Sequence, residues 1–337
     1  MGKPGWLGVR VRGVLGARSS AQHRILVLVL ATLGLTVAFG ATGLCNWVAE
    51  WVDAADDGGD VVAIGDLEPS VFYCDVTNGV NQGLWHARLH TDTWQYEQLD
   101  VEKVNGVSAA GTPAGHFWVI YYAPDSQELR CAHYDGTAWS VEIVATGLIG
   151  LRTGGAVRVD NLGRPHLSYF LATGQLYGEI RYAWRDSAGW HDSVVVFGYV
   201  GGQSLALSTS GAPSICYISS ASMYGYYYLK YAWHDGSYWQ SATVDSSVRA
   251  NQPSLSVDSA GWAHVAYWDS TNRRLRYARG SGTAWDVQIV DPESSAGFHH
   301  SLALDSGGRP HICYEDSTSS GLKYAHNDGG GVASRGC

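Results

Sequence analysis

Three aspartates recur at one position of a repeated pattern, and they are the residues of this chain best suited to acid–base chemistry. Asp75, Asp269 and Asp316 each follow two residues after a tyrosine, and Glu315 adjoins the last of them. Two carboxylates across a sugar can protonate a leaving group and activate a nucleophile. A short carboxylate in this place also suits the capping of a turn. Catalysis and turn capping therefore both remain interpretations of these residues.

Residues that could bind a ligand open the fifth and sixth copies of the pattern. They are Arg249 and Asn251 in the fifth copy, and His299 and His300 in the sixth. Together with the carboxylates they predict a cluster able to bind a sugar or a cation, or to transfer protons.

Tyrosines fill two long connections in the third and fourth copies, at Tyr177, Tyr224 and Tyr226. Exposed tyrosine rings stack on sugars or anchor protein partners, whereas tyrosines on a strand would pack between sheets. Both interpretations stay open. Three histidines, His166, His264 and His311, precede a repeated tyrosine by three residues and favour a structural hydrogen bond. The His and Cys spacing predicts neither a metal site nor a cofactor.

The pattern itself has three columns that each recur six times, which indicates a repeat architecture. The columns are a tryptophan (Trp47, Trp94, Trp139, Trp190, Trp239 and Trp285), a tyrosine (Tyr73, Tyr121, Tyr169, Tyr217, Tyr267 and Tyr314) and an alanine (Ala87, Ala132, Ala183, Ala232, Ala278 and Ala325). An aliphatic residue follows each tryptophan by five, and in four copies an aspartate comes next: Asp53, Asp100, Asp245 and Asp291.

Each copy reads as four short strands with alternating apolar residues and Gly-rich turns, the pattern of a propeller blade. The sixth copy has no tryptophan strand after Asp328, whereas the segment 46–53 carries an orphan one. We therefore predict an all-β, six-bladed β-propeller over residues 45–337, closed by the N-terminal strand completing the last blade. Closure also removes exposed strand edges, and Cys45 and Cys337 are candidates for a disulfide at the junction.

The residues before the propeller differ in composition. Five of the 22 Lys and Arg residues lie before residue 45, and all 31 Asp and Glu residues follow it. Residues 1–24 are predicted to be a basic cytoplasmic region, and the apolar run 25–44 a transmembrane helix or a signal peptide. The remainder is then extracytoplasmic, either membrane-anchored or secreted. Its acidic charge argues against a nucleic-acid partner.

Three turns between the expected third and fourth strands carry a shared motif, in the segments YDGTAW, HDGSYW and RDSAGW. This motif resembles the Asp-box (BNR) repeats of the sialidase superfamily in degenerate form. The resemblance implies the scaffold of that superfamily without its catalytic set, because Arg152 and Arg249 have no third arginine at an equivalent place.

The sequence therefore favours a non-catalytic, monomeric binding module that recognises a glycan or a protein through its loop face. The alternative is a glycoside hydrolase or lyase that uses Asp75, Asp269, Asp316 or Glu315 as its acids. A structural surface protein is a third possibility.

Overall fold

The computed structural model of the chain describes a β-strand protein. The residues described are 26–28, 49–51, 57–62, 69–77, 80–90, 93–148, 155–174, 177–222, 225–292, 296–316, 321–327 and 332–336. Every regular element within these ranges is a strand, as the richness in Trp, Tyr and Val predicts. Cys45, Cys337 and Tyr224 lie outside the described residues, so the proposed disulfide stays a prediction.

The first two repeats each form a separate four-stranded antiparallel sheet. Repeat one consists of β3 (Asp57–Val62), β4 (Ser70–Thr77), β5 (Val80–His90) and β6 (Thr93–Asp100). Repeat two consists of β7 (Asn105–Gly111), β8 (Phe117–Ala123), β9 (Glu128–Tyr134) and β10 (Trp139–Ala145).

Repeats three and four share one seven-stranded sheet. Its strands are β11 (Ala156–Val159), β12 (Pro165–Gly174), β13 (Tyr177–Asp186), β14 (Gly189–Leu207), β15 (Pro213–Ser220), β16 (Tyr228–His234) and β17 (Trp239–Asp245). The 19-residue strand β14 pairs with β13 through its first half and with β15 through its second. It therefore serves as the last strand of repeat three and the first strand of repeat four.

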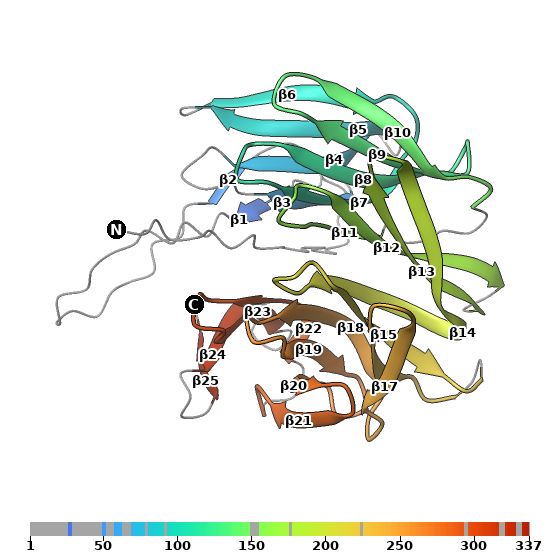
Figure 1. Cartoon of the computed structure of the whole chain (residues 1–337). Helices are drawn as coiled ribbons and strands as arrows, with labels where there is room; N and C mark the ends of the chain where they lie inside the picture. Colours follow the sequence, from blue (N-terminus) through green and yellow to red (C-terminus); the bar gives the residue numbers. More distant parts are fainter. Residues whose placement is uncertain are drawn as a thin grey trace, which may run out of the picture.

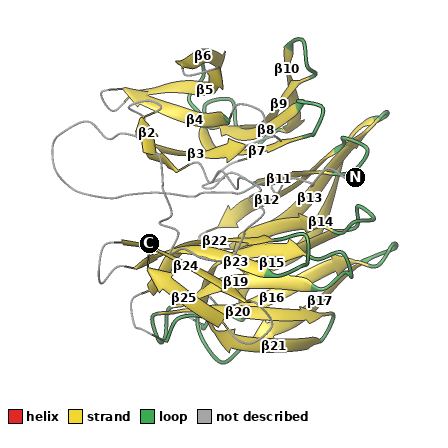
Figure 2. Cartoon of the chain, turned by 90° about the vertical axis from the view of Figure 1, so that its left-hand side faces the viewer, coloured by secondary structure: helices red, strands yellow, loops and turns green. Residues whose placement is uncertain are grey.

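The last two repeats again form four-stranded sheets. Repeat five has β18 (Ala250–Val257), β19 (Ala263–Asp269), β20 (Arg274–Ser281) and β21 (Ala284–Ile289). Repeat six has β22 (Ala296–Leu304), β23 (Pro310–Asp316), β24 (Gly321–Asn327) and β25 (Val332–Gly336). Figures 1 and 2 show the sheets following one another around the molecule, with β6 and β21 at its outer edges.

The first strand of each repeat packs against the first strand of the next, from β3 through β7, β11, β14 and β18 to β22. Serine hydroxyls link these strands. Ser204 Oγ accepts the backbone N–H of Leu255 over 3.2 Å, and Ser254 Oγ accepts that of Leu302 over 3.1 Å. No comparable packing joins β22 to β3 within the described residues.

The end of the repeat series differs from the prediction. β25 pairs with β24, with His326 opposite Ala333, and so takes the place expected for the N-terminal strand. Ala49–Trp51 (β2) pairs instead with Leu26–Leu28 (β1). The prediction that the N-terminal strand completes the last blade is therefore wrong in this structure. A physical reason is that β25 follows β24 after four residues, so this hairpin costs little loop-closure entropy.

The helix predicted over 25–44 is contradicted where the structure describes it, because Leu26–Leu28 form a strand. Among the described residues, no helix has the length and apolar character needed to cross a membrane. The rest of the 25–44 run lies outside the described residues.

The repeated aromatic residues form the core. All six tyrosines of the tyrosine column are among the most deeply buried large side chains. The column tryptophans pack across the junctions between repeats: the Trp239 ring lies 5.3 Å from that of Tyr182, and the Trp285 ring lies 5.1 Å from that of Tyr231. Because Trp239 and Trp285 each cover the preceding repeat, these side chains hold consecutive repeats together.

Candidate ligand-binding site

Asp269, one of the predicted acids, caps a turn. Its side chain is fully buried. Its Oδ1 accepts the backbone N–H groups of Thr271 and Asn272 at 3.0 Å, and its Oδ2 accepts Arg276 Nε at 2.9 Å. All of its acceptor positions are directed inward, so Asp269 orders the connection between β19 and β20 and is not positioned to meet a substrate.

Asp316 is also buried, and its Oδ2 lies 3.2 Å from Lys323 Nζ. Lys323 Nζ also lies 3.2 Å from Asp291, so one cation neutralises two carboxylates. The backbone of Asp75 lies in β4, and its side chain is not described. Neither Asp269 nor Asp316 therefore belongs to an exposed acidic group.

Glu315 is the one predicted acid that is both described and partly exposed. His299 Nδ1 donates to Glu315 Oε2 over 2.6 Å, across the β22–β23 pair. The two side chains keep 26% and 34% of their surface exposed, so a ligand can reach them. His300 points the other way: its Nδ1 donates to the Gly297 carbonyl at 2.9 Å, and burial lowers its pKa.

Tyr226 and Arg249 form the most exposed pair among the predicted ligand-binding residues. The Tyr226 side chain is 61% exposed, and the Arg249 guanidinium carbon lies 5.9 Å from the centre of its ring. This distance is within the range of a cation–π contact. The pair therefore offers an aromatic face and a bundle of N–H donors side by side on the surface.

Backbone hydrogen bonds hold Arg249 from two sides. Its N–H donates to Thr271 Oγ1 at 3.0 Å, and its carbonyl accepts the Ser270 N–H at 2.9 Å. The next residue, Ala250, donates to the Tyr227 carbonyl at 2.9 Å. The loops of repeats four and five thus fix Arg249 and position it beside Tyr226. Asn251 follows on β18 and is half-buried.

Tyr177 belongs to the packing interpretation rather than to this exposed pair. Its half-buried ring lies edge-on at 4.8 Å from both Phe197 and Tyr199 on the neighbouring strand β14. It packs at the start of β13, at the end of the β13–β14 ladder away from the connecting turn.

Aspartates at the ends of the fourth strands bind the buried tyrosines of the next repeat. Tyr121 donates to Asp100 over 2.8 Å, and Tyr314 donates to Asp291 over 2.8 Å. A cation from the adjacent third strand completes each group, as with Arg130 Nη1 at 2.8 Å from Asp100. The sequence showed these columns but not their pairing. The signal that was missed is a basic residue two positions before the alanine column in repeats two to six. These residues are Arg130, Arg181, Lys230, Arg276 and Lys323.

At His264 and His166 the histidine column makes the structural hydrogen bonds that the sequence predicted. Tyr277 Oη lies 2.6 Å from His264 Nδ1, while His264 Nε2 lies 3.2 Å from Asp258 Oδ2. The carboxylate must accept, so Nε2 donates and Nδ1 accepts the tyrosine proton. His166 repeats the arrangement with Tyr182 and Asp160. Both ring nitrogens of His264 and His166 are therefore occupied within the protein.

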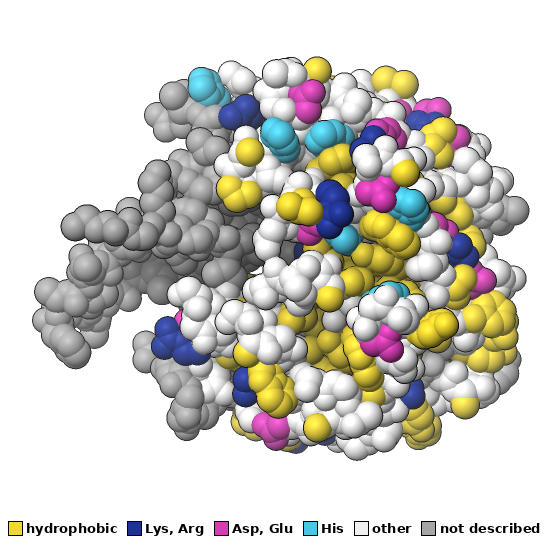
Figure 3. Space-filling view, viewed as in Figure 1, with side chains coloured by type: hydrophobic (Ala, Val, Ile, Leu, Met, Phe, Trp, Pro, Cys, Tyr) yellow, Lys and Arg dark blue, Asp and Glu magenta, His cyan; other side chains and the backbone are white. Residues whose placement is uncertain are grey.

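Over the residues that the structure describes, no group of three His, Cys, Asp or Glu side chains could hold a metal ion. Cys74, Cys131 and Cys216 are buried cysteines outside any disulfide, and burial raises the pKa of Cys131 and Cys216. Figure 3 shows charged side chains of both signs scattered over the visible face rather than gathered in one patch. The exposed Tyr226–Arg249 pair is therefore the best-supported candidate site.

Solved structures with a similar fold include a lectin and a polysaccharide lyase. A mutant of Aleuria aurantia lectin in complex with α-methyl-L-fucoside has a TM-score of 0.53 at 14% identity, over 83% of this chain and 91% of the lectin. An ulvan lyase of a polysaccharide lyase family has a TM-score of 0.59 at 10% identity, over 82% of this chain and 80% of the lyase. The same lyase bound to a chain of glucuronic acid and sulfated rhamnose gives a TM-score of 0.58.

These similarities define the class of fold: the chain is an all-β protein of the propeller type. No family model matches the sequence, and no curated protein does.

Proposed function

We propose that this chain is a non-catalytic glycan-binding β-propeller with six four-stranded blades, displayed outside the cytoplasm. The observation that carries the proposal is the exposed Tyr226 ring beside the Arg249 guanidinium, 5.9 Å apart and held by the loops of two consecutive repeats. Aromatic rings stack on the C–H face of a sugar, and arginine donates to hydroxyl or carboxylate oxygens.

The surrounding geometry favours binding over turnover. Asp269 and Asp316 are committed to internal hydrogen bonds and ion pairs. Two carboxylates are needed for glycoside hydrolysis, and Glu315 is the one candidate among those described that a substrate could reach. The similarity in fold to a fucose-binding lectin fits this proposal, and the similarity to a lyase fits the alternative.

The remaining features of the proposal concern cellular context. The acidic propeller would act as a monomer, reached by a glycan rather than by nucleic acid, with a protein ligand as the second option. The basic residues 1–24 would stay in the cytoplasm, and residues 25–44 would direct export either as a retained anchor or as a cleaved signal.

A binding experiment with matched variants tests the glycan proposal. The purified chain is applied to a glycan array, and the affinity for the best glycan is measured by calorimetry for the wild type, Tyr226→Ala and Arg249→Ala. Tyr238→Ala is the control, because Tyr238 is 74% exposed and lies in the β16–β17 turn.

We expect each site variant to weaken binding at least tenfold, about the value of one lost stacking or charge-assisted contact. The control variant is expected to bind like the wild type. A blank array, or equal affinity for all four proteins, would refute the proposal.

A further inference from the structure

An aspartate organises the turn between the first and second strands in repeats three, five and six. In repeats three and six, Oδ1 of Asp160 and of Asp305 accepts backbone N–H groups of its own turn. Oδ2 accepts the side chain of an arginine four residues later: Arg164 Nε donates to Asp160 at 2.7 Å, and Arg309 Nε donates to Asp305 at 2.7 Å. The arginine at this position therefore balances the charge of the turn.

Repeat five keeps the aspartate but has Trp262 at the position of the arginine. Asp258 is buried, and its Oδ1 accepts the backbone N–H groups of Ala260 at 2.9 Å and Trp262 at 2.8 Å. The cation comes instead from β20, where Arg279 Nη2 lies 3.5 Å from Asp258 Oδ2. Because Arg279 supplies the balancing charge, the turn does not require the indole ring of Trp262.

Trp262 lies on the surface beside Arg279. It is 39% exposed, and the Arg279 guanidinium carbon lies 4.9 Å from the centre of its ring, within the range of a cation–π contact. The Arg279 side chain keeps 47% of its surface exposed. Within the described part of the chain, the indole N–H of Trp262 has no hydrogen-bond partner. The pair thus combines an accessible aromatic ring with N–H donors, as Tyr226 and Arg249 do.

Contacts beneath the pair hold the turn in place. The Trp262 carbonyl accepts the Asp258 N–H at 2.9 Å, and His264 Nε2 donates to Asp258 Oδ2 over 3.2 Å. The corresponding turn of repeat six packs against Asp258, since a Cβ added at Gly308 would lie 3.4 Å from the Asp258 Cβ. A ligand that meets an aromatic ring on such a fixed backbone loses little free energy to ordering the protein.

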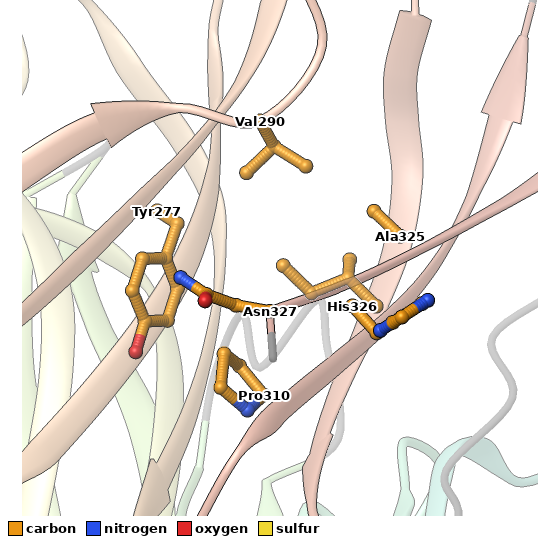
Figure 4. Close-up of a pocket in the computed structure, with 7 residues that line it drawn as sticks. Tyr277, Val290, Pro310, Ala325, His326 and Asn327 are labelled. Atoms are coloured by element: carbon orange, nitrogen blue, oxygen red, sulfur yellow. The ribbon is translucent and has the colours of Figure 1, made fainter. Parts of the chain in front are cut away.

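The cavity shown in Figure 4 is not an alternative sugar site on this repeat. It lies between repeats five and six and is lined by apolar surface, with Tyr277 and Ala325 in its wall. Its volume is about 10 Å³, room for about one water molecule. A sugar does not fit there, so the surface pair is the candidate on repeat five.

The Trp262–Arg279 pair and the Tyr226–Arg249 pair lie at opposite ends of the strands. Arg249 directly precedes β18, whereas Trp262 lies in the turn between β18 and β19. The eight residues of β18 separate these two ends by about 25 Å. One sugar ring therefore cannot contact both pairs.

We propose that Trp262 and Arg279 form a second glycan-binding site, so that a single chain bridges two glycans. This inference rests on the proposed function, because both sites take the same class of ligand. The indole ring stacks on the C–H face of a sugar, while its N–H and the Arg279 guanidinium donate to hydroxyl or carboxylate oxygens. Because the sites lie at opposite ends of the molecule, glycans on two separate surfaces fill them together.

Calorimetry and glycan-coated beads test the second site in the full-length chain, with the best glycan of the array used as a short oligosaccharide. The site variant is Trp262→Arg, which restores the residue that pairs with the turn aspartate in repeats three and six. Its Tm should stay within about 2 °C of the wild-type value, so that a loss of binding is not a loss of folding. Leu162→Ala is the control, because Leu162 is 75% exposed in the equivalent turn of repeat three.

We expect the wild type and Leu162→Ala to bind two glycans per chain and to aggregate the beads. Trp262→Arg should bind one glycan with unchanged affinity at the remaining site, and aggregation should require at least about tenfold more protein. Tyr226→Ala should also bind one glycan, because the tenfold loss expected of that variant applies to its own site.

The pattern of losses separates the two sites. One glycan per wild-type chain, lost in Tyr226→Ala and retained in Trp262→Arg, overturns the second site and leaves the Tyr226 site standing. The reverse pattern refutes the Tyr226 site and, with it, the bridging of two glycans. Aggregation by Trp262→Arg equal to that of the wild type overturns the proposal, and a blank array refutes both sites.

Discussion

The hydroxyl of Tyr267 donates to Asp245 Oδ2 over 2.5 Å and so joins β19 to the end of β17 in the preceding repeat. Arg276 approaches the same carboxylate oxygen at 3.4 Å. The bond is buried, and burial raises the pKa of Tyr267, as the hydrogen bond to the Asp245 carboxylate also does. A group of this kind connects two sheets that share no strand.

Removing that hydroxyl is expected to destabilise the protein. Tyr267→Phe should lower the free energy of unfolding by about 1–3 kcal/mol, because it removes one donor from a buried carboxylate. Tyr217→Phe is the matched control: its partner is the neutral Ser241 of the same repeat, and the expected loss is about 1 kcal/mol or less. Denaturant unfolding measures both. A larger loss for Tyr217→Phe would contradict the role given to Asp245.

Acid should destabilise the chain well above the pKa range of its carboxyl groups. Burial lowers the pKa of His264 and His166 below the ordinary value of 6.5. The folded state therefore binds fewer protons than the unfolded state below about pH 6.5, so stability falls as pH falls through that value. Above about pH 6.5 these two histidines are neutral in both the folded and the unfolded state, so they no longer make stability depend on pH.

Unfolding free energies measured between pH 7.5 and pH 5 test this expectation. The slope attributable to one histidine is at most about 1.4 kcal/mol per pH unit. His264→Gln keeps a polar side chain between Tyr277 and Asp258 but cannot titrate, so it should reduce the slope. An unchanged slope would show that His264 does not titrate differently in the two states.

Gly83 is expected to be far less tolerant of substitution than Gly115, although both have positive φ values, +100° and +84°. A Cβ added at Gly83 would meet the carbonyl oxygen of Asp100 at 2.0 Å, whereas one at Gly115 would meet nothing within 4 Å. Gly115→Ala should cost about 1 kcal/mol from backbone strain alone, and Gly83→Ala about 3 kcal/mol or more. Thermal unfolding of the two variants provides the comparison.

Glu315 tests the enzymatic alternative. If the chain only binds glycans, Glu315→Gln should change the affinity less than twofold, and chromogenic glycosides should give no product with the wild type. His299→Gln is the companion variant, because His299 is the 2.6 Å partner of Glu315. Turnover by the wild type that disappears in Glu315→Gln would favour a hydrolase or lyase instead.

Repeated positions were the most predictable part of this chain. The tyrosine, tryptophan and histidine columns recur because each repeat offers the same local environment, so the repeat architecture followed from the pattern. The turn-capping interpretation of Asp269 was available from its local sequence, because a capping aspartate bonds to residues two and three positions later.

Contacts between distant positions were less predictable. The pairing of Tyr226 with Arg249, and of Glu315 with His299, depends on how loops of different strands approach one another, and spacing along one strand does not encode this. β25 escaped detection because its five residues carry neither a tryptophan nor an alternating pattern. The fourth strand of repeat six was therefore assigned to the N-terminal segment.

Strand β14 couples the third and fourth repeats mechanically. Since one uninterrupted 19-residue strand is hydrogen-bonded to β13 along its first half and to β15 along its second, neither neighbour can peel away without fraying a ladder common to both. Under mechanical tension or in native-state hydrogen exchange, repeats three and four should therefore open together as one unit. The junctions on either side, where the sheets share no strand, should part first.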